Sequence, residues 1–234
     1  MEKKYSTLLF DADNTLLDFD SAEEKALSRV LAEIGIEATK EITGLYSEIN
    51  LSYWRAFERG EVTKSELRIA RFADLFREIG FHTDMDLVFI ADTYLSYLGE
   101  GADLLEGATE LCEKLRQEDY KIYIVTNGVA KTQKKRLSKS GLDRFIDGLF
   151  VSETIGSQKP QPEFFDYVLE HIEEKEKRKI LVIGDSYGSD IKGACNAGLD
   201  CVWLNLKGEK NVNAFPITKE IKDLRELFGF FGLK

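Results

Sequence analysis

The sequence predicts an α/β protein with a doubly wound parallel sheet, into which a helical cap is inserted. Two observations lead to this prediction. Short apolar runs alternate with segments of helical period over most of the chain, which is the pattern of βαβ units. One interval, from about Phe19 to Glu100, breaks the alternation, because it contains consecutive helical patterns and no convincing strand. We therefore expect an α/β core over residues 1–18 and 101–234, and a helical cap over residues 19–100.

Short β-rich apolar runs supply the strands of the predicted core. Each is bounded by polar or turn-forming residues, as expected for buried strands. The segments between the later runs have helical period and would connect neighbouring strands of a parallel sheet. The predicted strands are Ser6–Phe10, Lys121–Thr126, Leu149–Ser152, Ile180–Gly184 and Cys201–Asn205, and the predicted helices include Gly107–Asp119, Pro162–Glu173 and Ile191–Ala197.

The inserted interval carries start and stop signals of helices. Ser21-Ala22-Glu23-Glu24 has the spacing of a capping box, and the apolar face that follows it ends at Gly35. The segment from Thr63 to Glu66 repeats the start signal, and its helix ends at Gly80. Apolar faces of this kind bury one another in a small bundle.

Charge and hydropathy exclude several classes of partner. The chain has 32 basic and 42 acidic residues, and a formal charge of -10 repels nucleic acid polymers and anionic membranes. The opening residues lack the apolar length of a signal peptide, and no stretch approaches the roughly 18 apolar residues of a membrane span. We therefore expect a cytoplasmic protein. Its three cysteines form no metal-ligand pair and are expected to be reduced core thiols.

The first chemical motif follows the first predicted strand. Asp11 and Asp13 emerge directly after Leu8-Leu9-Phe10, at the sheet edge where open parallel sheets bind ligands. Two acids so close repel each other unless a cation or a shared proton compensates, and Mg²⁺ prefers carboxylate oxygens. Taken alone, the motif fits a solvated acidic turn or a helix cap about equally well.

Two further motifs follow later strands. Thr126-Asn127-Gly128 ends the second strand with a hydroxyl, an amide and a flexible backbone, all able to donate hydrogen bonds to phosphate oxygens. Lys159, after the third strand, offers one positive charge that can offset acids and phosphate. Each is weak alone, because Thr-Asn-Gly is also an ordinary strand-to-turn junction and a lone lysine is usually surface charge.

The fourth motif adds two carboxylates at the same sheet edge. Asp185 and Asp190 follow the apolar run Ile180–Ile183 within a glycine-containing loop. The loop also fits a simple turn followed by a helix N-cap at Ser189 or Asp190. The combination is far more specific than any member, because successive strand ends supply acids, donors and a lysine to one edge. It predicts a site that binds a metal ion and a phosphate group.

These four motifs, in this order, resemble those of the haloacid dehalogenase-like hydrolase superfamily, over essentially the whole chain. The resemblance implies a Rossmann-like hydrolase core with a helical cap, a Mg²⁺ cofactor and an aspartyl-phosphate intermediate. It implies that Asp11 is the nucleophile and Asp13 the general acid and base. The remaining implied ligands are Asp11, the Asp13 carbonyl and Asp185 for the metal, and Thr126, Asn127, Gly128 and Lys159 for the phosphate, with Asp190 acting indirectly by orienting Lys159 or metal waters.

Closer matching indicates a branch of the superfamily. Asp11-Ala12-Asp13-Asn14-Thr15-Leu16, and Thr126-Asn127-Gly128 followed by Gln133 and Arg136, resemble the bacterial pyrimidine 5'-nucleotidases. That resemblance implies a small phosphorylated substrate, a nucleoside monophosphate. Sugar phosphates or phosphoglycolate remain an alternative because the cap is hard to interpret, and a non-enzymatic phosphate-dependent switch is a further one that Asp13 argues against. Asn14 departs from the superfamily, in which many members have glycine there.

Overall fold

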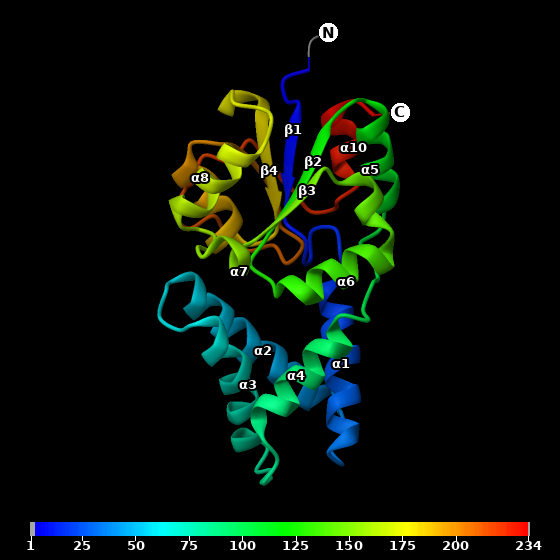
Figure 1. Ribbon diagram of the computed structural model, residues 1–234, viewed down its shortest axis with the longest axis vertical. Helices are drawn as coiled ribbons and strands as arrows, with labels where there is room; N and C mark the ends of the chain where they lie inside the picture. Colours follow the sequence, from blue (N-terminus) through cyan, green and yellow to red (C-terminus); the bar gives the residue numbers. More distant parts are fainter. Residues whose placement is uncertain (1–2, 234) are drawn as a thin grey trace. The chain divides into compact units, whose positions relative to one another are not determined.

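The computed structural model describes residues 3–233, and the chain divides into two compact units (Figure 1). One unit contains the chain up to Asp18 and again from Ala102 onward, and the other is the continuous segment Phe19–Gly101. The first unit holds every strand within the described residues, and the second is entirely helical apart from its turns.

The first unit is built on a six-stranded sheet in which every neighbouring pair of strands is parallel. The strand order is β3-β2-β1-β4-β5-β6, so the chain moves outward from β1 in one direction and then continues on the other side from β4. The predicted fold class is thereby confirmed. The strands are β1 Thr7–Phe10, β2 Lys121–Thr126, β3 Gly148–Val151, β4 Ile180–Gly184, β5 Asp200–Leu204 and β6 Lys219–Ile221.

Helices cover both faces of this sheet, as Figure 1 shows for α5 and α8. Successive residues of β1 face opposite sides, because Leu8 and Phe10 pack in one apolar cluster and Leu9 in the other. The first cluster includes residues of α5, α6 and α10, and the second includes residues of α8 and α9. The helices of this unit are α5 Ala108–Gln117, α6 Ala130–Ser140, α7 Ser152–Ile155, α8 Pro162–His171, α9 Lys192–Ala197 and α10 Glu226–Phe231, with short helical turns η1 Leu142–Phe145, η2 Lys177–Lys179 and η3 Tyr187–Ile191.

The predicted strands differ from the observed ones by at most one residue at each end. β6 was not among the predicted strands, and α6 was not among the helices named as examples. β6 is a three-residue edge strand of sequence Lys-Glu-Ile, and it has no apolar run because only Ile221 is buried. The sequence of α6 is largely polar, so it lacks an apolar stripe. The predicted helix Ile191–Ala197 begins at Lys192, because a single π-helical turn precedes it.

The second unit is a four-helix bundle with its own apolar core. Thr63 caps its helix as predicted, since its side chain accepts from the N–H of Glu66 and the Glu66 side chain returns to the Thr63 N–H. The capping box predicted at Ser21 is wrong. The first helix already begins at Phe19, whose ring packs against the bundle core, so Ser21 lies inside the first turn. The helices are α1 Phe19–Glu33, α2 Lys40–Glu58, α3 Lys64–Glu78 and α4 Leu87–Leu98.

A buried polar cluster lies within this bundle. Glu23 is 4% exposed and accepts hydrogen bonds from Ser47 and from Asn50 of α2. Arg71 of α3, which is 2% exposed, donates to Oδ1 of Asn50 over 2.9 Å. Burial raises the pKa of Glu23, and the hydrogen bonds and Arg71 only partly offset this rise. The carboxyl group is therefore held in a place that disfavours its charged form.

Within residues 3–233, no helix is both long and apolar enough to cross a membrane. The segments that leave and re-enter the first unit run beside each other there. Asp18 N–H donates to the Asp103 carbonyl over 2.9 Å, and Leu105 N–H donates to the Leu16 carbonyl over 3.0 Å. The long insertion therefore starts and ends at one place in the first unit.

Candidate active site

The site lies where the strand order of the sheet reverses. β1 and β4 are neighbours whose chains continue toward opposite edges, and their carboxyl ends flank the crevice that such a switch point creates. Asp11 directly follows β1, and its N–H donates to the Ile183 carbonyl of β4 over 2.8 Å. Asp185 directly follows β4. Two predicted site residues are therefore brought together by the register of a single strand pair.

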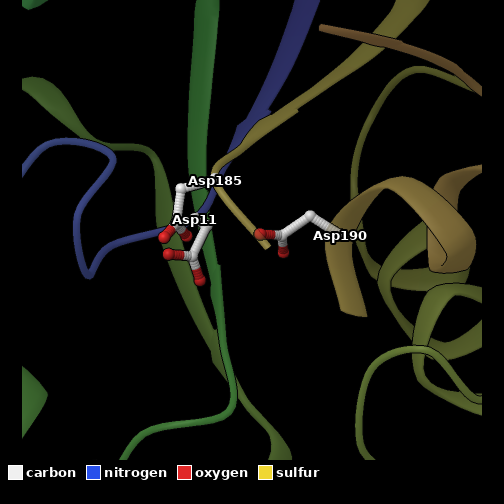
Figure 2. A group of neighbouring side chains, drawn as sticks. All are labelled: Asp11, Asp185 and Asp190. Atoms are coloured by element: carbon white, nitrogen blue, oxygen red, sulfur yellow. The ribbon is translucent and has the colours of Figure 1, made fainter. Parts of the chain in front are cut away.

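Three carboxyl groups gather at this point. Figure 2 shows those of Asp11 and Asp185 beside each other, with that of Asp190 turned toward them from the following helical turn. Each of the three residues offers an oxygen, and these oxygens all lie within 4.8 Å of one another. Asp11 and Asp190 are buried, and Asp185 is partly exposed. This arrangement suits a hard divalent cation.

Lys159 supplies the positive charge of the group. Its side chain is 1% exposed, and Nζ donates to Oδ1 of Asp11 over 2.7 Å and to Oδ1 of Asp190 over 2.6 Å. A third bond runs from Nζ to the carbonyl oxygen of Val125 over 2.7 Å. A buried ammonium group with three acceptors is fully satisfied, because it has three hydrogens to donate. The lysine is therefore a built part of the site and not surface charge.

Asn127 fixes the backbone that carries this lysine. Its side-chain Nδ2 donates to the Lys159 carbonyl over 2.9 Å, and its Oδ1 accepts from the Lys159 N–H over 3.0 Å. The next residue, Pro160, follows a cis peptide bond, and its carbonyl accepts from Nδ2 of Asn196 over 3.0 Å. The end of β2 and the Lys159 segment are thus joined by a reciprocal pair of hydrogen bonds.

Asp190 is held by the turn in which it lies. Its Oδ2 accepts from the Ser186 N–H over 3.0 Å, while the Ser186 side chain accepts from the Ser189 N–H. The N-cap residue of this turn is therefore Ser186, and not Ser189 or Asp190, which the sequence had suggested as N-caps. A β-carbon on Gly184 would lie 2.3 Å from the Asp190 carboxyl group, so glycine is needed there for the close approach. The other carboxylate oxygen, Oδ1, accepts from Nζ of Lys159.

The charges of the group do not balance within the chain. Three carboxylates surround one ammonium group. The pKa of Asp11 is raised to about 7, mainly by burial and also by the charges of Asp190 and Asp13, although Lys159 opposes the rise. Burial and then the charges of Asp11 and Asp190 raise the pKa of Asp185 well above its usual range. The pKa of Lys159 is raised by the two acids despite its burial. The three carboxyl groups are therefore more easily ionised together when a cation is bound between them.

Asp13 is oriented differently from these acids, and its side chain is not part of the group defined above within residues 3–233. Its carboxylate accepts hydrogen bonds from Gln133 and Arg136 of α6. The following residue, Asn14, has φ of 52°, in the left-handed region that favours glycine and tolerates asparagine. This explains why a residue other than glycine is accepted there.

Thr126 lies at the end of β2 and is 1% exposed. Its Oγ1 accepts from the Gly128 N–H over 3.0 Å and from Nε2 of Gln133 over 3.0 Å. The hydroxyl hydrogen of Thr126 is still a donor. The Gly128 N–H, in contrast, is directed at Thr126 in this geometry. The sequence motifs assign no role to Gln133 and Arg136. Their spacing of three residues, which places both on one face of a helix, is the sequence signal that they act together.

Fold and site together define a class: doubly wound α/β proteins with a carboxylate-rich, cation-compatible site at the switch point. A model described as haloacid dehalogenase-like hydrolase matches residues 8–204. The chain belongs to this family, which confirms the resemblance drawn from its four motifs and makes it a hydrolase.

Similar curated proteins extend this result. The chain is 43% identical over 232 residues to YfnB, a hydrolase of the family from Bacillus subtilis, covering 99% of this chain and 97% of that protein. It is 37% identical over 223 residues to the pyrimidine 5'-nucleotidase PynA of Streptococcus pneumoniae, covering 95% and 93%. It is 31% identical over 224 residues to the pyrimidine 5'-nucleotidase YjjG of Escherichia coli, covering 96% of each.

Solved structures agree with the fold. The crystal structure of YfnB bound to magnesium superposes with a TM-score of 0.91 at 42% identity, covering 99% of this chain and 100% of that one. A dehalogenase structure superposes with a TM-score of 0.78 at 22% identity, covering 100% of each chain, and at this identity it shows the fold alone.

Proposed function

We propose that the protein is a magnesium-dependent phosphatase that hydrolyses nucleoside 5'-monophosphates through an aspartyl-phosphate on Asp11. The observation that carries the proposal is the position of Asp11. Its carboxylate lies at the switch point, is bonded to the buried ammonium group of Lys159, and is followed two residues later by a second acid, Asp13. A nucleophile, a cation that offsets phosphate charge and an acid–base group are the parts that such a reaction needs.

The roles follow from this geometry. Asp11 attacks phosphorus, so that an oxygen–phosphorus bond forms on its carboxylate while the ester bond to the leaving oxygen breaks. Asp13 gives its proton to that oxygen and afterwards takes one from the water that cleaves the aspartyl-phosphate. Thr126, through its hydroxyl, holds a phosphate oxygen, and Lys159 holds another when its ammonium group exchanges the hydrogen bond to Asp11 for one to phosphate. Asp190 keeps Lys159 in place through the bond to Nζ.

The donor set fits Mg²⁺. Lys159 occupies Oδ1 of Asp11 and Oδ1 of Asp190, so Oδ2 of Asp11 and the carboxylate of Asp185 are the oxygens best placed to hold the ion. The bound ion offsets the negative charge of the acids and of a phosphate group. Asp13 contributes through its backbone carbonyl, since its side chain is bonded to α6. The magnesium in the YfnB structure supports this assignment.

The substrate class is supported by the relatives. Two pyrimidine 5'-nucleotidases match over more than nine-tenths of their lengths. A sugar phosphate is the second candidate, because a glyceraldehyde 3-phosphate phosphatase of Methanopyrus kandleri is 30% identical over 202 residues, covering 82% of this chain and 80% of that protein. We propose further that the helical unit is the cap that selects between these substrates.

Release of phosphate from nucleoside monophosphates, sugar phosphates and phosphoglycolate tests the proposal. We expect preferred turnover of pyrimidine monophosphates with Mg²⁺, its loss in EDTA, and its loss in Asp11→Asn, which keeps the shape of the side chain and removes the nucleophile. Asp223→Asn, a change of the same kind at an exposed carboxylate paired with Arg225, is the control and is expected to retain turnover. Absence of phosphate release from the whole panel would refute the phosphatase, and selectivity for sugar phosphates would refute the nucleotidase.

A further inference from the structure

Two buried side chains of α6 grip the carboxylate of Asp13. Nε2 of Gln133 donates to Oδ2 of Asp13 over 2.7 Å, and Nη1 of Arg136 donates to Oδ1. Each carboxylate oxygen therefore has its own donor, and the plane of the group is fixed. Gln133 is 1% exposed and Arg136 is fully buried, whereas 29% of the Asp13 side chain is exposed. One side of the carboxylate is held from the interior while the other stays reachable.

Stability alone does not account for this arrangement. A buried ion pair contributes little compared with apolar side chains of the same size, because both charges must be removed from water. Here the arginine is removed from water completely and its partner only in part. A fully buried guanidinium group bonded to a partly exposed carboxylate fixes the orientation of that carboxylate.

Gln133 also connects two groups of the site. The same Nε2 that donates to Asp13 donates to Oγ1 of Thr126 over 3.0 Å, using the two hydrogens of the amide. The glutamine passes directly over Gly128, since a β-carbon there would lie 2.6 Å from Nε2 and 2.8 Å from Cδ. The lack of a side chain on Gly128 is what allows the amide to reach both partners.

We infer that Gln133 and Arg136 are positioning residues that set the Asp13 carboxylate for proton transfer to the leaving oxygen and from water. The inference rests on the proposed function, because it assigns a purpose to contacts of its acid–base group. Neither residue touches the reacting atoms. The effect of Arg136 passes through Asp13, whereas that of Gln133 passes through both Asp13 and Thr126. Only the part that passes through Asp13 depends on the leaving group, because that acid gives the leaving oxygen its proton.

Esters that differ in their leaving group separate this role from a structural one. An alkyl ester, such as a nucleoside monophosphate, expels a strongly basic oxygen that needs the proton, whereas para-nitrophenyl phosphate expels a stable phenolate that does not. The kcat/KM value reports steps only up to formation of the aspartyl-phosphate. We expect Gln133→Met and Arg136→Met to lower kcat/KM for the alkyl ester about 10- to 100-fold relative to that for the aryl ester, a part of the usual contribution of acid–base catalysis.

Three controls complete the test. Leu137→Ala removes packing from the same buried helix face and should leave the ratio of the two kcat/KM values unchanged. Gly128→Ala should lower the ratio by displacing Gln133. In Asp13→Asn, adding Gln133→Met should lower the ratio no further, because the two changes act through one group.

The outcomes distinguish the inference from the function on which it rests. A lower ratio in Gln133→Met, absent from Leu137→Ala, supports the positioning role. Equal losses for both esters, or no loss, overturn it, and if Arg136→Met does not fold the Gln133→Met result decides. Failure of the proposed function has another signature: the unmodified protein releases no phosphate from either ester, or Asp11→Asn releases it as fast.

Discussion

Replacing Asp190 with asparagine should destabilise the fold much less than the breaking of a buried ion pair usually does. At 2.6 Å, the attraction between Nζ of Lys159 and Asp190 is about 6 kcal/mol at an effective dielectric constant of about 20. The same carboxylate lies within 4.8 Å of Asp11 and of Asp185, and each of these repulsions is about 3.5 kcal/mol or more. Where Asp11 and Asp185 are both ionised, these repulsions cancel the attraction.

What remains is a hydrogen-bond mismatch. The carboxylate accepts from both Lys159 and the Ser186 N–H, but an asparagine has only one acceptor oxygen and must turn its amide toward one of these donors. An unsatisfied buried group costs about 1–3 kcal/mol. We expect Asp190→Asn to lower the free energy of unfolding by about that amount in EDTA, instead of the usual 3–5 kcal/mol.

Urea unfolding followed by circular dichroism, in EDTA and in excess Mg²⁺, measures this difference. A bound cation already offsets the repulsions, so the same substitution should cost more with Mg²⁺ than without it. Asp223→Asn, at an exposed carboxylate, should change the free energy of unfolding by less than about 1 kcal/mol in both conditions. A loss of about 5 kcal/mol in EDTA, or no dependence on Mg²⁺, would show that the repulsion from Asp11 and Asp185 does not cancel the attraction of Asp190 to Lys159.

Three further predictions concern other features. Glu23→Gln should reduce the dependence of stability on pH. Folding raises the pKa of Glu23, so its contribution to stability is complete below the unfolded pKa and is lost as pH rises through the folded pKa. The fall in the urea midpoint with rising pH should therefore be smaller for Glu23→Gln than for the unmodified protein, and equal falls would contradict this. Gly184→Ala places a β-carbon 2.3 Å from the Asp190 carboxyl group and should lower kcat at least about 10-fold, whereas Gly229→Ala, with no atom within 4 Å, should leave phosphate release unchanged. Asn14→Ala keeps φ of 52° but lacks the local hydrogen bonding of asparagine, so it should lower the free energy of unfolding by about 1 kcal/mol. Asn14→Gly should not lower it. Equal melting temperatures for the two variants would contradict this prediction.

The sequence predicted the strands whose residues are buried along almost their whole length. β1, β2 and β4 are central strands buried on both faces, so they are continuous apolar runs that need no further information. β6 escaped prediction because an edge strand with one buried residue has the composition of a loop. The start of α1 was misplaced because packing of Phe19 extended the helix past a local capping signal.

The candidate site shows the same division. The chain order of its acids and of Lys159 is visible in the sequence. The register of β1 and β4 brings Asp11 and Asp185 together, and the helical turn after β4 adds Asp190. The partners of Asp13 are not visible in the same way. Gln133 and Arg136 lie on a helix whose buried face is polar, and hydrophobic periodicity gives no indication that such a helix faces inward. Their spacing and the family resemblance single out the two residues, but only the hydrogen bonds across the fold identify them as partners of Asp13.

The paired backbone bonds at Asp18–Asp103 and Leu16–Leu105 make the helical insertion a modular part of the chain. Its two ends meet at a point that the first unit already fastens, so loop-closure entropy depends little on what is inserted between them. Helices there can lengthen, shorten or be exchanged without altering the turn that bears Asp11 and Asp13. If this unit selects the substrate, as we propose, substrate preference can change while the turn with the catalytic acids stays the same.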